Sequence, residues 1–263
     1  MFLDEELLNK ISQAAVFLKR SRFTTAFTGA GISVESGIPP FRGPGGIWNN
    51  YDPEVLEIGY FLKNPIHSWE IINRIFYDFY RSARPNKAHL VLAQMEQEGM
   101  LGKIITQNID NLHQDAGSRL VTEFHGNLKK LRCLGCQREF SAKEISLDHL
   151  PPTCRGCGEL LKPDFVFFGE AIPQKALFAS HEAAGLSDVL LIIGTTGEVT
   201  PANQIPQVAK DCGATIIEIN QEPSLYTQKI TDLFLRGKAA EIMGKIGELL
   251  FTSSLDDDQD RVN

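Results

Sequence analysis

Two pairs of cysteines place the tightest constraint on how this chain folds. Each pair has the spacing C-x-x-C, and seventeen residues separate the pairs. One such pair presents two thiolates to an ion from a tight turn, so two pairs complete the tetrahedral sulfur site that zinc prefers. Because four thiolates fill the coordination sphere, the ion is expected to be structural. The expected ligands are Cys133, Cys136, Cys154 and Cys157.

The alternatives are that these four thiols are unrelated to one another or that they form two disulfides. The N-terminus M-F-L-D-E-E-L-L-N-K has acids where a secretory signal needs positive charge, and no apolar run reaches membrane-spanning length. We therefore expect a soluble, cytoplasmic chain, in which thiols stay reduced and cysteine pairs bind metal more often than they form disulfides. The fifth cysteine, Cys212, lies on an apolar helical face and is expected in the core.

Length and charge limit the remaining choices. The chain has 263 residues, 43% of them hydrophobic, and is expected to form one large domain with a smaller insertion. Its net charge of −7 disfavours direct nucleic-acid binding, which depends on Lys and Arg, and suits basic peptide substrates.

Short apolar, β-branched runs alternate with segments of helical periodicity along the chain. Such alternation predicts a parallel sheet covered by helices on both faces. The expected fold is α/β, a Rossmann-like doubly wound parallel sheet with a smaller domain made of a zinc-binding module and a helical module. The expected strands are 23–27, 103–106, 120–124, 164–168, 189–193 and 214–219. The expected helices lie within 3–18, 88–95, 205–212 and 242–250, and the helical module within 60–80.

The domain boundaries follow from where this pattern is interrupted. The sheet domain is expected to be discontinuous, made of 1–35, 85–128 and 162–255. Residues 36–84 hold a loop rich in Gly, Pro and Asn and the helical module, and 129–161 form the zinc module, which has few apolar residues of its own. The acidic tail, 256–263, is expected to be disordered.

A glycine loop follows the first expected strand. Gly29 and Gly31 leave no Cβ in the way of a close ligand, and a strand-to-helix turn here aims backbone N–H groups at phosphate oxygens. Glycines after a strand are also ordinary turn residues. The dinucleotide fingerprint G-x-G-x-x-G fails, because Val34 stands at its third glycine and no strand ends about twenty residues later. A hydride-transferring dehydrogenase is therefore disfavoured.

Polar residues also follow other expected strands, where a doubly wound sheet binds its ligand. They are Gln107, Asn108 and Asp110 after one strand, His125 after another, Gly194, Thr195 and Thr196 after a third, and Asn220 after a fourth. Each has a structural explanation when taken singly, such as a helix cap, a core histidine or a turn. Their joint occurrence favours a ligand site.

Together these motifs resemble those of the sirtuin family of NAD-dependent protein-lysine deacylases. The matching stretches are G-A-G-I-S-V-E-S-G-I-P-P-F-R-G (29–43), T-Q-N-I-D-N-L-H (106–113), F-H-G-N (124–127), the four cysteines, K-P-D-F-V-F-F-G-E (162–170), G-T-T (194–196) and I-N-Q-E (219–222). They span nearly the whole chain in the family's order.

The resemblance implies roles for individual residues. The catalytic residues would be His125, as general base, with Asn108 and Asp110. NAD would be bound by Gly29, Ala30, Gly31, Ser33, Phe41, Arg42, Gln107, Asn108, Ile109, Asp110, Gly194, Thr195, Thr196, Asn220 and Ala239. The acyl-lysine substrate would contact Val166, Phe168, Gly169, Glu198 and Val199.

The implied reaction consumes NAD as a co-substrate and uses one structural zinc ion. The acyl oxygen of an acylated protein or peptide attacks the ribose carbon that carries nicotinamide, nicotinamide leaves, and an alkylimidate forms. His125 then deprotonates a ribose hydroxyl, which takes the acyl group, so that free lysine and O-acyl-ADP-ribose are released. Histidine suits this step because its ordinary pKa, about 6.5, lies near working pH.

Two other functions use the same pocket: a mono-ADP-ribosyltransferase, and an NAD-sensing protein whose zinc module docks a partner. The presence of Asn108, Asp110 and His125 together favours the deacylase. Relatives that prefer acidic acyl groups carry a Tyr and an Arg where this chain has Asn73 and Phe76, so acetyl or another uncharged group is expected. The chain departs from the family at Pro40, Gly197 and Glu198, and the last two leave its peptide preference open.

Overall fold

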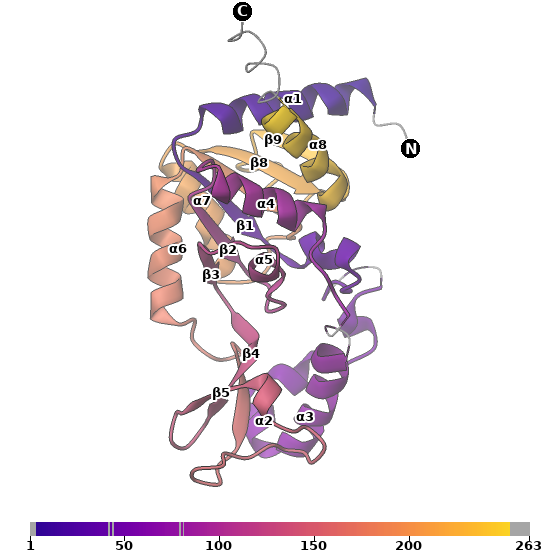
Figure 1. Ribbon diagram of the computed structural model, residues 1–263, viewed down its shortest axis with the longest axis vertical. Helices are drawn as coiled ribbons and strands as arrows, with labels where there is room; N and C mark the ends of the chain where they lie inside the picture. The colour runs from indigo at the N-terminus through magenta and orange to yellow at the C-terminus, as the bar shows by residue number, and fades with distance from the viewer. Residues whose placement is uncertain (1–3, 42, 44, 79, 81, 253–263) are drawn as a thin grey trace, which may run out of the picture.

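The protein consists of a large parallel sheet with its covering helices and a smaller part that lies below them in Figure 1. The computed structural model describes residues 4–41, 43, 45–78, 80 and 82–252. Its strands are β1 Thr24–Thr28, β2 Lys103–Thr106, β3 Val121–Glu123, β4 Gly126–Cys133, β5 Glu139–Ser141, β6 Leu161–Phe165, β7 Val189–Ile193, β8 Thr215–Asn220 and β9 Leu233–Arg236. Its α-helices are α1 Glu5–Arg20, α2 Ile58–Lys63, α3 Pro65–Ile72, α4 Lys87–Gln97, α5 Leu112–Asp115, α6 Gln174–Leu186, α7 Ile205–Asp211 and α8 Ala239–Phe251.

Shorter helical turns complete the elements. Four of them bear on the site or the small part: η1 Ala30–Ser36, η2 Ile47–Asn49, η3 Pro53–Leu56 and the π-helical turn η4 Asn73–Asp78. Two others are η5 Ala142–Glu144 and η6 Ala202–Gln204.

The six strands of the large sheet run in the order β3-β2-β1-β7-β8-β9, and every neighbouring pair is parallel. The strand order reverses direction between β1 and β7. In doubly wound sheets, this switch point is where the loops at the carboxyl ends of the strands diverge and leave room for a ligand. The expected Rossmann-like sheet is confirmed.

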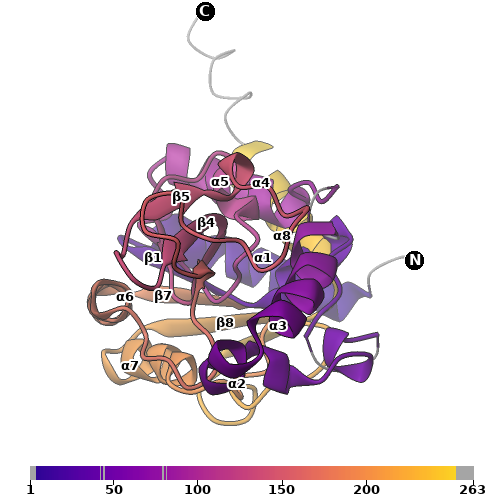
Figure 2. The ribbon, with the colours of Figure 1, turned by 90° about the horizontal axis from the view of Figure 1, so that it is seen from below.

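Alternation along each central strand divides the core into two layers. Ala26, Ile104 and Leu191 point to the layer made with α1, α4 and α8. Their direct neighbours Phe27, Ile105 and Leu190 point to the layer made with α6 and α7. Because successive side chains of a strand face opposite sides, apolar residues at consecutive positions bury both faces of the sheet. Figure 2 shows the two groups of helices on either side of β7 and β8.

The smaller part combines an antiparallel sheet of order β5-β4-β6 with the helical segment from η2 to η4. Its two halves share one hydrophobic core, in which Trp69 and Phe76 of the helical segment pack with Leu131 and Phe165 of the sheet. The Trp69 indole N–H also donates to the Leu161 carbonyl at 3.0 Å. The hydrophobic core of the cysteine-containing segment is therefore completed by helices that precede it by more than fifty residues.

Two expectations about single elements were wrong. The strand expected at 164–168 is β6, which ends at Phe165 and pairs with β4 in the small antiparallel sheet instead of joining the parallel one. Cys212 is exposed beyond the end of α7, not buried in the core. In both cases the apolar pattern correctly indicated that nearby residues are buried. It did not show which part of the chain the segment contacts in the folded protein.

Three elements, α6, β4 and β9, were not expected, because their sequences carry only weak signals of a helix or a strand. Helix α6 is rich in small residues and buries only Ser180, Ala183 and Ala184. Strand β4 carries Lys129 and Lys130 at its centre, and β9 has four residues.

The domain boundaries drawn from the sequence stay a prediction, and the acidic tail lies outside the described residues. Within the described part of the chain, no helix is long and apolar enough to cross a membrane.

At Gly126 the chain leaves the large sheet and enters the small one, so a substitution there tests this junction. Its φ is +75°, and a Cβ there would overlap the carbonyl oxygen of Asp164. We expect Gly126→Ala to lower the free energy of unfolding by about 2 kcal/mol or more, because strain and overlap add. Urea unfolding measures it. The control Gly59→Ala, in α2 with open space around it, should be neutral or stabilising, and equal behaviour of the two variants would contradict the assignment.

Candidate functional site

The loops after β1 and β7 interlock at the switch point of the sheet. The Gly29 N–H donates to the Ile193 carbonyl at 3.0 Å, and the Gly31 N–H donates to the Gly194 carbonyl at 2.8 Å. A Cβ on Gly31 would lie 2.6 Å from the Gly194 Cα. The N–H groups of these two glycines are therefore used by the end of β7 and the residue after it, and the missing Cβ atoms allow the close approach of the two loops.

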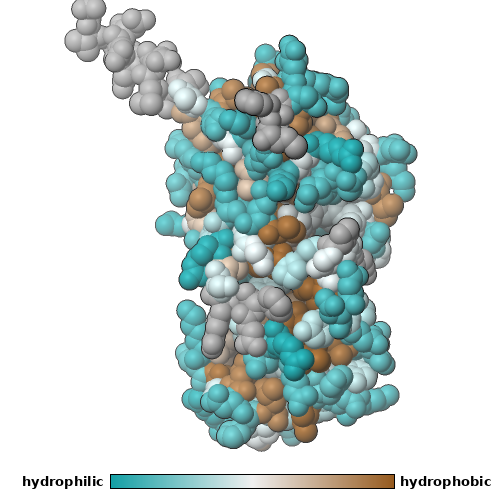
Figure 3. Space-filling model, turned by 90° about the vertical axis from the view of Figure 1, so that its right-hand side faces the viewer, coloured by the Kyte–Doolittle hydropathy of each residue, from teal (hydrophilic) through white to brown (hydrophobic). Residues whose placement is uncertain are grey.

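A small pocket opens where this loop meets the loop after β2. Six of the residues that line it were expected from the sequence: Ala30, Ser33, Phe41, Asn108, Ile109 and Asp110. Ile38 and Tyr80 complete the lining and were not expected. In Figure 3, apolar surface reaches the exterior where the molecule narrows between its two parts. The structure thus brings together residues from η1, from the segment that follows it and from the loop after β2.

Hydrogen bonds fix the polar groups of this pocket. Ser33 Oγ donates to Asp110 Oδ2 at 2.7 Å, and the Leu112 N–H donates to Asp110 Oδ1 at 2.9 Å. The Asn108 side-chain amide donates to the Gly29 carbonyl and to Ser33 Oγ. Burial raises the pKa of Asp110, and the two hydrogen bonds oppose that rise. The pocket thus holds a carboxyl group in a desolvated setting, suited to accept hydrogen bonds from an amide ligand.

His125 lies on the turn between β3 and β4, next to the loop after β2. Its Nδ1 is 3.1 Å from the Gln107 carbonyl oxygen, which only accepts, so Nδ1 carries the proton and Nε2 keeps its lone pair. Burial lowers the pKa of His125, although the bond to Gln107 opposes this. The imidazole is therefore held neutral and in the tautomer that makes Nε2 a base.

The remaining residues expected near a nucleotide lie along the same sheet edge. The Gln107 amide donates to Thr195 Oγ1 at 3.1 Å, and the Asn220 amide donates to the Thr195 carbonyl at 3.0 Å. Thr196 is exposed. Ala239 begins α8, whose next N–H, that of Ala240, donates to a side-chain oxygen of Glu35 in η1. Arg42 lies outside the described residues.

The segment expected to bind an acyl-lysine bridges the two parts of the molecule. The Val166 N–H donates to the His125 carbonyl at 2.8 Å, and Phe168 exchanges backbone hydrogen bonds with Leu56 and Ile58. The Phe168 side chain is 42% exposed, and its ring centroid lies 6.5 Å from that of Trp48. Gly169 follows with a φ of +86°. Glu198 and Val199 lie in the loop between β7 and α7.

Glu123 links the two loops that carry the polar residues, and the sequence interpretation missed it. Its carboxylate accepts three side-chain amides: Asn111 at 2.7 Å, Gln114 at 2.8 Å and Asn127 at 2.8 Å. Asn111 has a left-handed backbone with a φ of 61°. Since Glu123 ends β3 two residues before His125, its place at the carboxyl end of a strand was the available signal.

A buried pair of histidines lies beneath the same loop. The rings of His89 and His113 meet edge to face at 4.9 Å, and His113 Nε2 lies 2.9 Å from Thr28 Oγ1. Thr28 donates to Thr106, whose hydroxyl accepts the Asn108 N–H. Burial lowers the pKa of His89 to about 4 and lowers that of His113 as well, so both rings are neutral supports of the loop.

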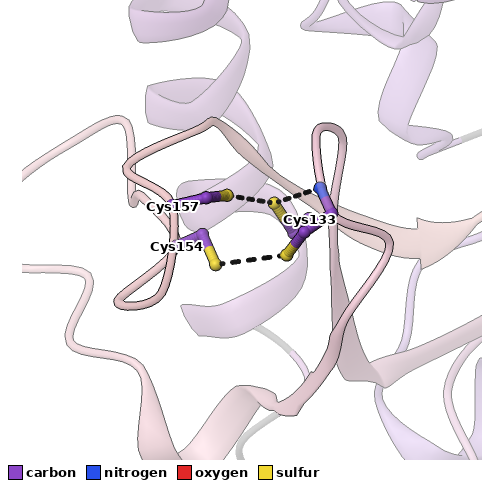
Figure 4. A group of neighbouring side chains, drawn as sticks. Cys133, Cys154 and Cys157 are labelled. Carbon is purple, nitrogen blue, oxygen red and sulfur yellow. Dashed lines mark hydrogen bonds between the residues drawn. The ribbon is translucent and has the colours of Figure 1, made fainter.

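The four expected metal ligands meet in one cluster. All four Sγ atoms lie within 4.8 Å of one another, with 3.4 Å between Cys133 and Cys157 and 3.7 Å between Cys136 and Cys154. Tetrahedral zinc with Zn–S bonds of about 2.3 Å needs sulfurs about 3.8 Å apart, so the cluster fits this ion. Figure 4 shows Cys154 and Cys157 on one turn facing Cys133 on the other.

Backbone N–H groups support the cluster. The Cys136 N–H points to the Cys133 sulfur and the Gly156 N–H to the Cys154 sulfur, each at 3.4 Å. Such donors stabilise thiolates, the form that binds metal. Because no position is left for a fifth ligand, the chemistry of this donor set is structural.

Fold and site together define a doubly wound nucleotide-binding protein with a four-cysteine module, and comparison with known proteins agrees. The model of the Sir2 family matches residues 29–201. NAD-dependent protein deacylase 2 of Pyrobaculum aerophilum is 45% identical over 89% of this chain and 93% of its own length. The NAD-dependent protein deacylase of Pyrococcus furiosus is 43% identical over 90% of this chain and 97% of its own length.

Solved structures match in the same way. A Sir2 homolog–NAD complex superposes with a TM-score of 0.83 at 39% identity, covering 96% of this chain and 95% of that one. A Sir2 complex with a p53 peptide and NAD+ has a TM-score of 0.83 at 32% identity, covering 90% and 96%. The chain belongs to the Sir2 family, as its motifs predicted.

The cysteine cluster generates a prediction with a matched control. Cys154→Ser replaces a thiolate by a hydroxyl that stays protonated at neutral pH, so the purified variant should hold well under one zinc per chain and unfold at lower urea. Cys212→Ser, which alters the exposed thiol outside the cluster, should keep its zinc. Mass spectrometry of the dialysed proteins measures the metal. A full complement of zinc in Cys154→Ser would contradict the ligand set.

Proposed function

We propose that this protein is an NAD-dependent protein-lysine deacetylase, which moves the acyl group of an acyl-lysine to ADP-ribose and releases nicotinamide. The observation that carries the proposal is the neutral His125, whose Nδ1 is bonded to Gln107 in the loop that ends in the pocket carboxyl of Asp110. The proposed base, His125, and the proposed amide-binding carboxyl of Asp110 are thus linked through the short loop after β2. Relatives named NAD-dependent protein deacylases, and Sir2 complexes with NAD and a peptide, support it.

The pocket is proposed to bind the nicotinamide end of NAD. Asp110, held by the Ser33 hydroxyl, offers an acceptor to a carboxamide, and Asn108 keeps Ser33 in place. Ile109 and Phe41 supply apolar walls. The adenosine half is proposed to follow the sheet edge past Gly194, Thr195, Thr196, Asn220 and Ala239. Arg42 is proposed to pair with phosphate, a role that suits its planar fork.

The reaction then needs two steps at this edge. The acyl oxygen of the substrate lysine attacks the ribose carbon that carries nicotinamide, and nicotinamide leaves. His125 Nε2 removes a proton from a ribose hydroxyl, which attacks the acyl carbon. The lysine amine then leaves, and a water molecule adds to the acyl carbon to give O-acyl-ADP-ribose. Because burial lowers its pKa, His125 keeps its base form to a lower pH than an exposed histidine does.

Substrate and metal follow from the same proposal. Acetylated proteins or peptides are the proposed partners, contacting Val166, Phe168, Gly169, Glu198 and Val199. One zinc ion, held by the four cysteines, would tie together the turns of the small part without entering the chemistry. A cytoplasmic location, and the absence of direct nucleic-acid binding, stay predictions from the sequence.

Replacement of the base tests the mechanism. His125→Ala should keep its fold and lower peptide-dependent nicotinamide release at steady state by on the order of a hundredfold or more. His149→Ala, an exposed histidine of the small part, is the matched control and should be unchanged. Near-normal turnover of folded His125→Ala would sink the proposal. Nicotinamide release without any peptide would favour an ADP-ribosyltransferase or a sensor instead.

Acyl preference is a separate prediction. Among the described residues, Trp48 lies beside the Phe168 ring and Ile58 donates a backbone hydrogen bond to the Phe168 carbonyl. The exposed Glu57 is its backbone partner in an isolated β-bridge. Phe76 is fully buried against Phe41 and Phe165, and its phenyl ring has no charge to pair with an acid. An acid on the acyl chain would lie unpaired beside these groups. Acetyl-lysine peptides should turn over faster than succinyl-lysine peptides of the same sequence, and the reverse order in kcat/KM would refute this.

A further inference from the structure

The segment between β6 and α6 is not held by a helix or a strand of its own. Its backbone bonds instead to the turn that carries His125, through Val166, and to the small part, through Phe168. Gly169 adds a left-handed residue. A segment in this position needs side chains to fix its shape, since its own backbone forms no ladder.

Lys162, in β6, supplies one of these side chains. It is only 7% exposed, and its ammonium donates to the carbonyls of Pro163 at 3.0 Å and Phe165 at 2.7 Å and to Glu170 Oε2 at 3.0 Å. Three donors therefore meet three acceptors. The same nitrogen lies 4.2 Å from the centroid of the Phe167 ring, a cation–π contact.

Glu170 closes the other end of the segment. Its Oε2 also accepts the Phe167 N–H at 2.7 Å, and its own N–H donates to the Phe167 carbonyl at 3.0 Å. One carboxylate oxygen thus joins the start of the segment, through Lys162, to the turn that ends it. We call these contacts the Lys162–Glu170 tie.

Net stability is a weak reason for such a tie. Burial lowers the pKa of Lys162 while Glu170 opposes that shift, which is the signature of an ion pair whose desolvation offsets its attraction. The Phe165 and Phe167 rings, stacked at 4.8 Å and buried, already anchor the segment to the core. The tie instead fixes the path of the backbone from Val166 to Gly169.

We propose that Lys162 and Glu170 are positioning residues that hold Val166–Gly169 in the shape that receives the acyl-lysine peptide. The inference rests on the proposed deacetylase function. Neither residue touches the reacting atoms. Replacing either residue should therefore weaken the binding of the peptide. The binding of NAD should change little, because the pocket beside β1 and β2 is built from other elements.

Steady-state kinetics of Lys162→Met, Glu170→Gln and the double variant test this. Lys162→Met should raise the KM for an acetyl-lysine peptide about tenfold, with the KM for NAD within about twofold of the parent. Glu170→Gln should be at least as harmful, because it leaves a buried ammonium without its counter-charge. Adding Lys162→Met to Glu170→Gln should then recover part of the loss. The control is Lys130→Met, on neighbouring β4, which breaks an exposed pair with Glu139 of β5.

An unchanged peptide KM in folded Lys162→Met, or equal rises in both KM values, would overturn the proposal. Amide hydrogen exchange of Val166–Gly169 supplies a readout that needs no activity, and it should rise in Lys162→Met but not in Lys130→Met. If the parent shows no peptide-dependent nicotinamide release, the proposed function fails. Exchange that is unchanged in Lys162→Met defeats the tie itself.

Discussion

The close approach of the loops after β1 and β7 is the constraint on which the site depends. Gly31 bonds to the Gly194 carbonyl, and neither backbone leaves space for a Cβ on the other. This contact turns η1 across the end of the sheet, where Ser33 reaches both Asp110 and Asn108. A bulkier residue at either glycine would move η1 outward, and the pocket would lose one wall and the hydroxyl that orients its carboxyl.

A second constraint is the passage from the large sheet to the small one. The chain leaves β3, turns at Phe124 and His125 and enters β4 at Gly126. His125, the proposed general base, therefore lies at the junction of the large and small sheets, with its ring bonded to the Gln107 carbonyl and its own carbonyl accepting the Val166 N–H. The small part, with its shared core and cysteine cluster, holds Val166 and the exposed Phe168 beside this turn.

Buried polar groups hold these loops in register. Glu123 gathers three amides, Asp110 takes a hydroxyl and an N–H, and Lys162 gives its three donors to three acceptors. Each polar group left unpaired in such a place would cost about 1–3 kcal/mol, so the loops have few alternative arrangements. The geometry of the site is thus determined by pairs of residues that are distant in sequence.

The sequence by itself determined the class of fold, the metal cluster and most of the pocket. Apolar runs at consecutive positions predict strands buried on both faces, and two C-x-x-C pairs are a local pattern whose chemistry does not depend on the rest of the chain. Only the tertiary structure decided that 161–165 joins the small sheet, that Gly29 and Gly31 bond to a neighbouring loop, and that Glu123, Tyr80 and Lys162 support the site. The physical reason is that periodicity reports which residues are buried, whereas the partner of a strand, a glycine or a charge is set by contacts across the fold.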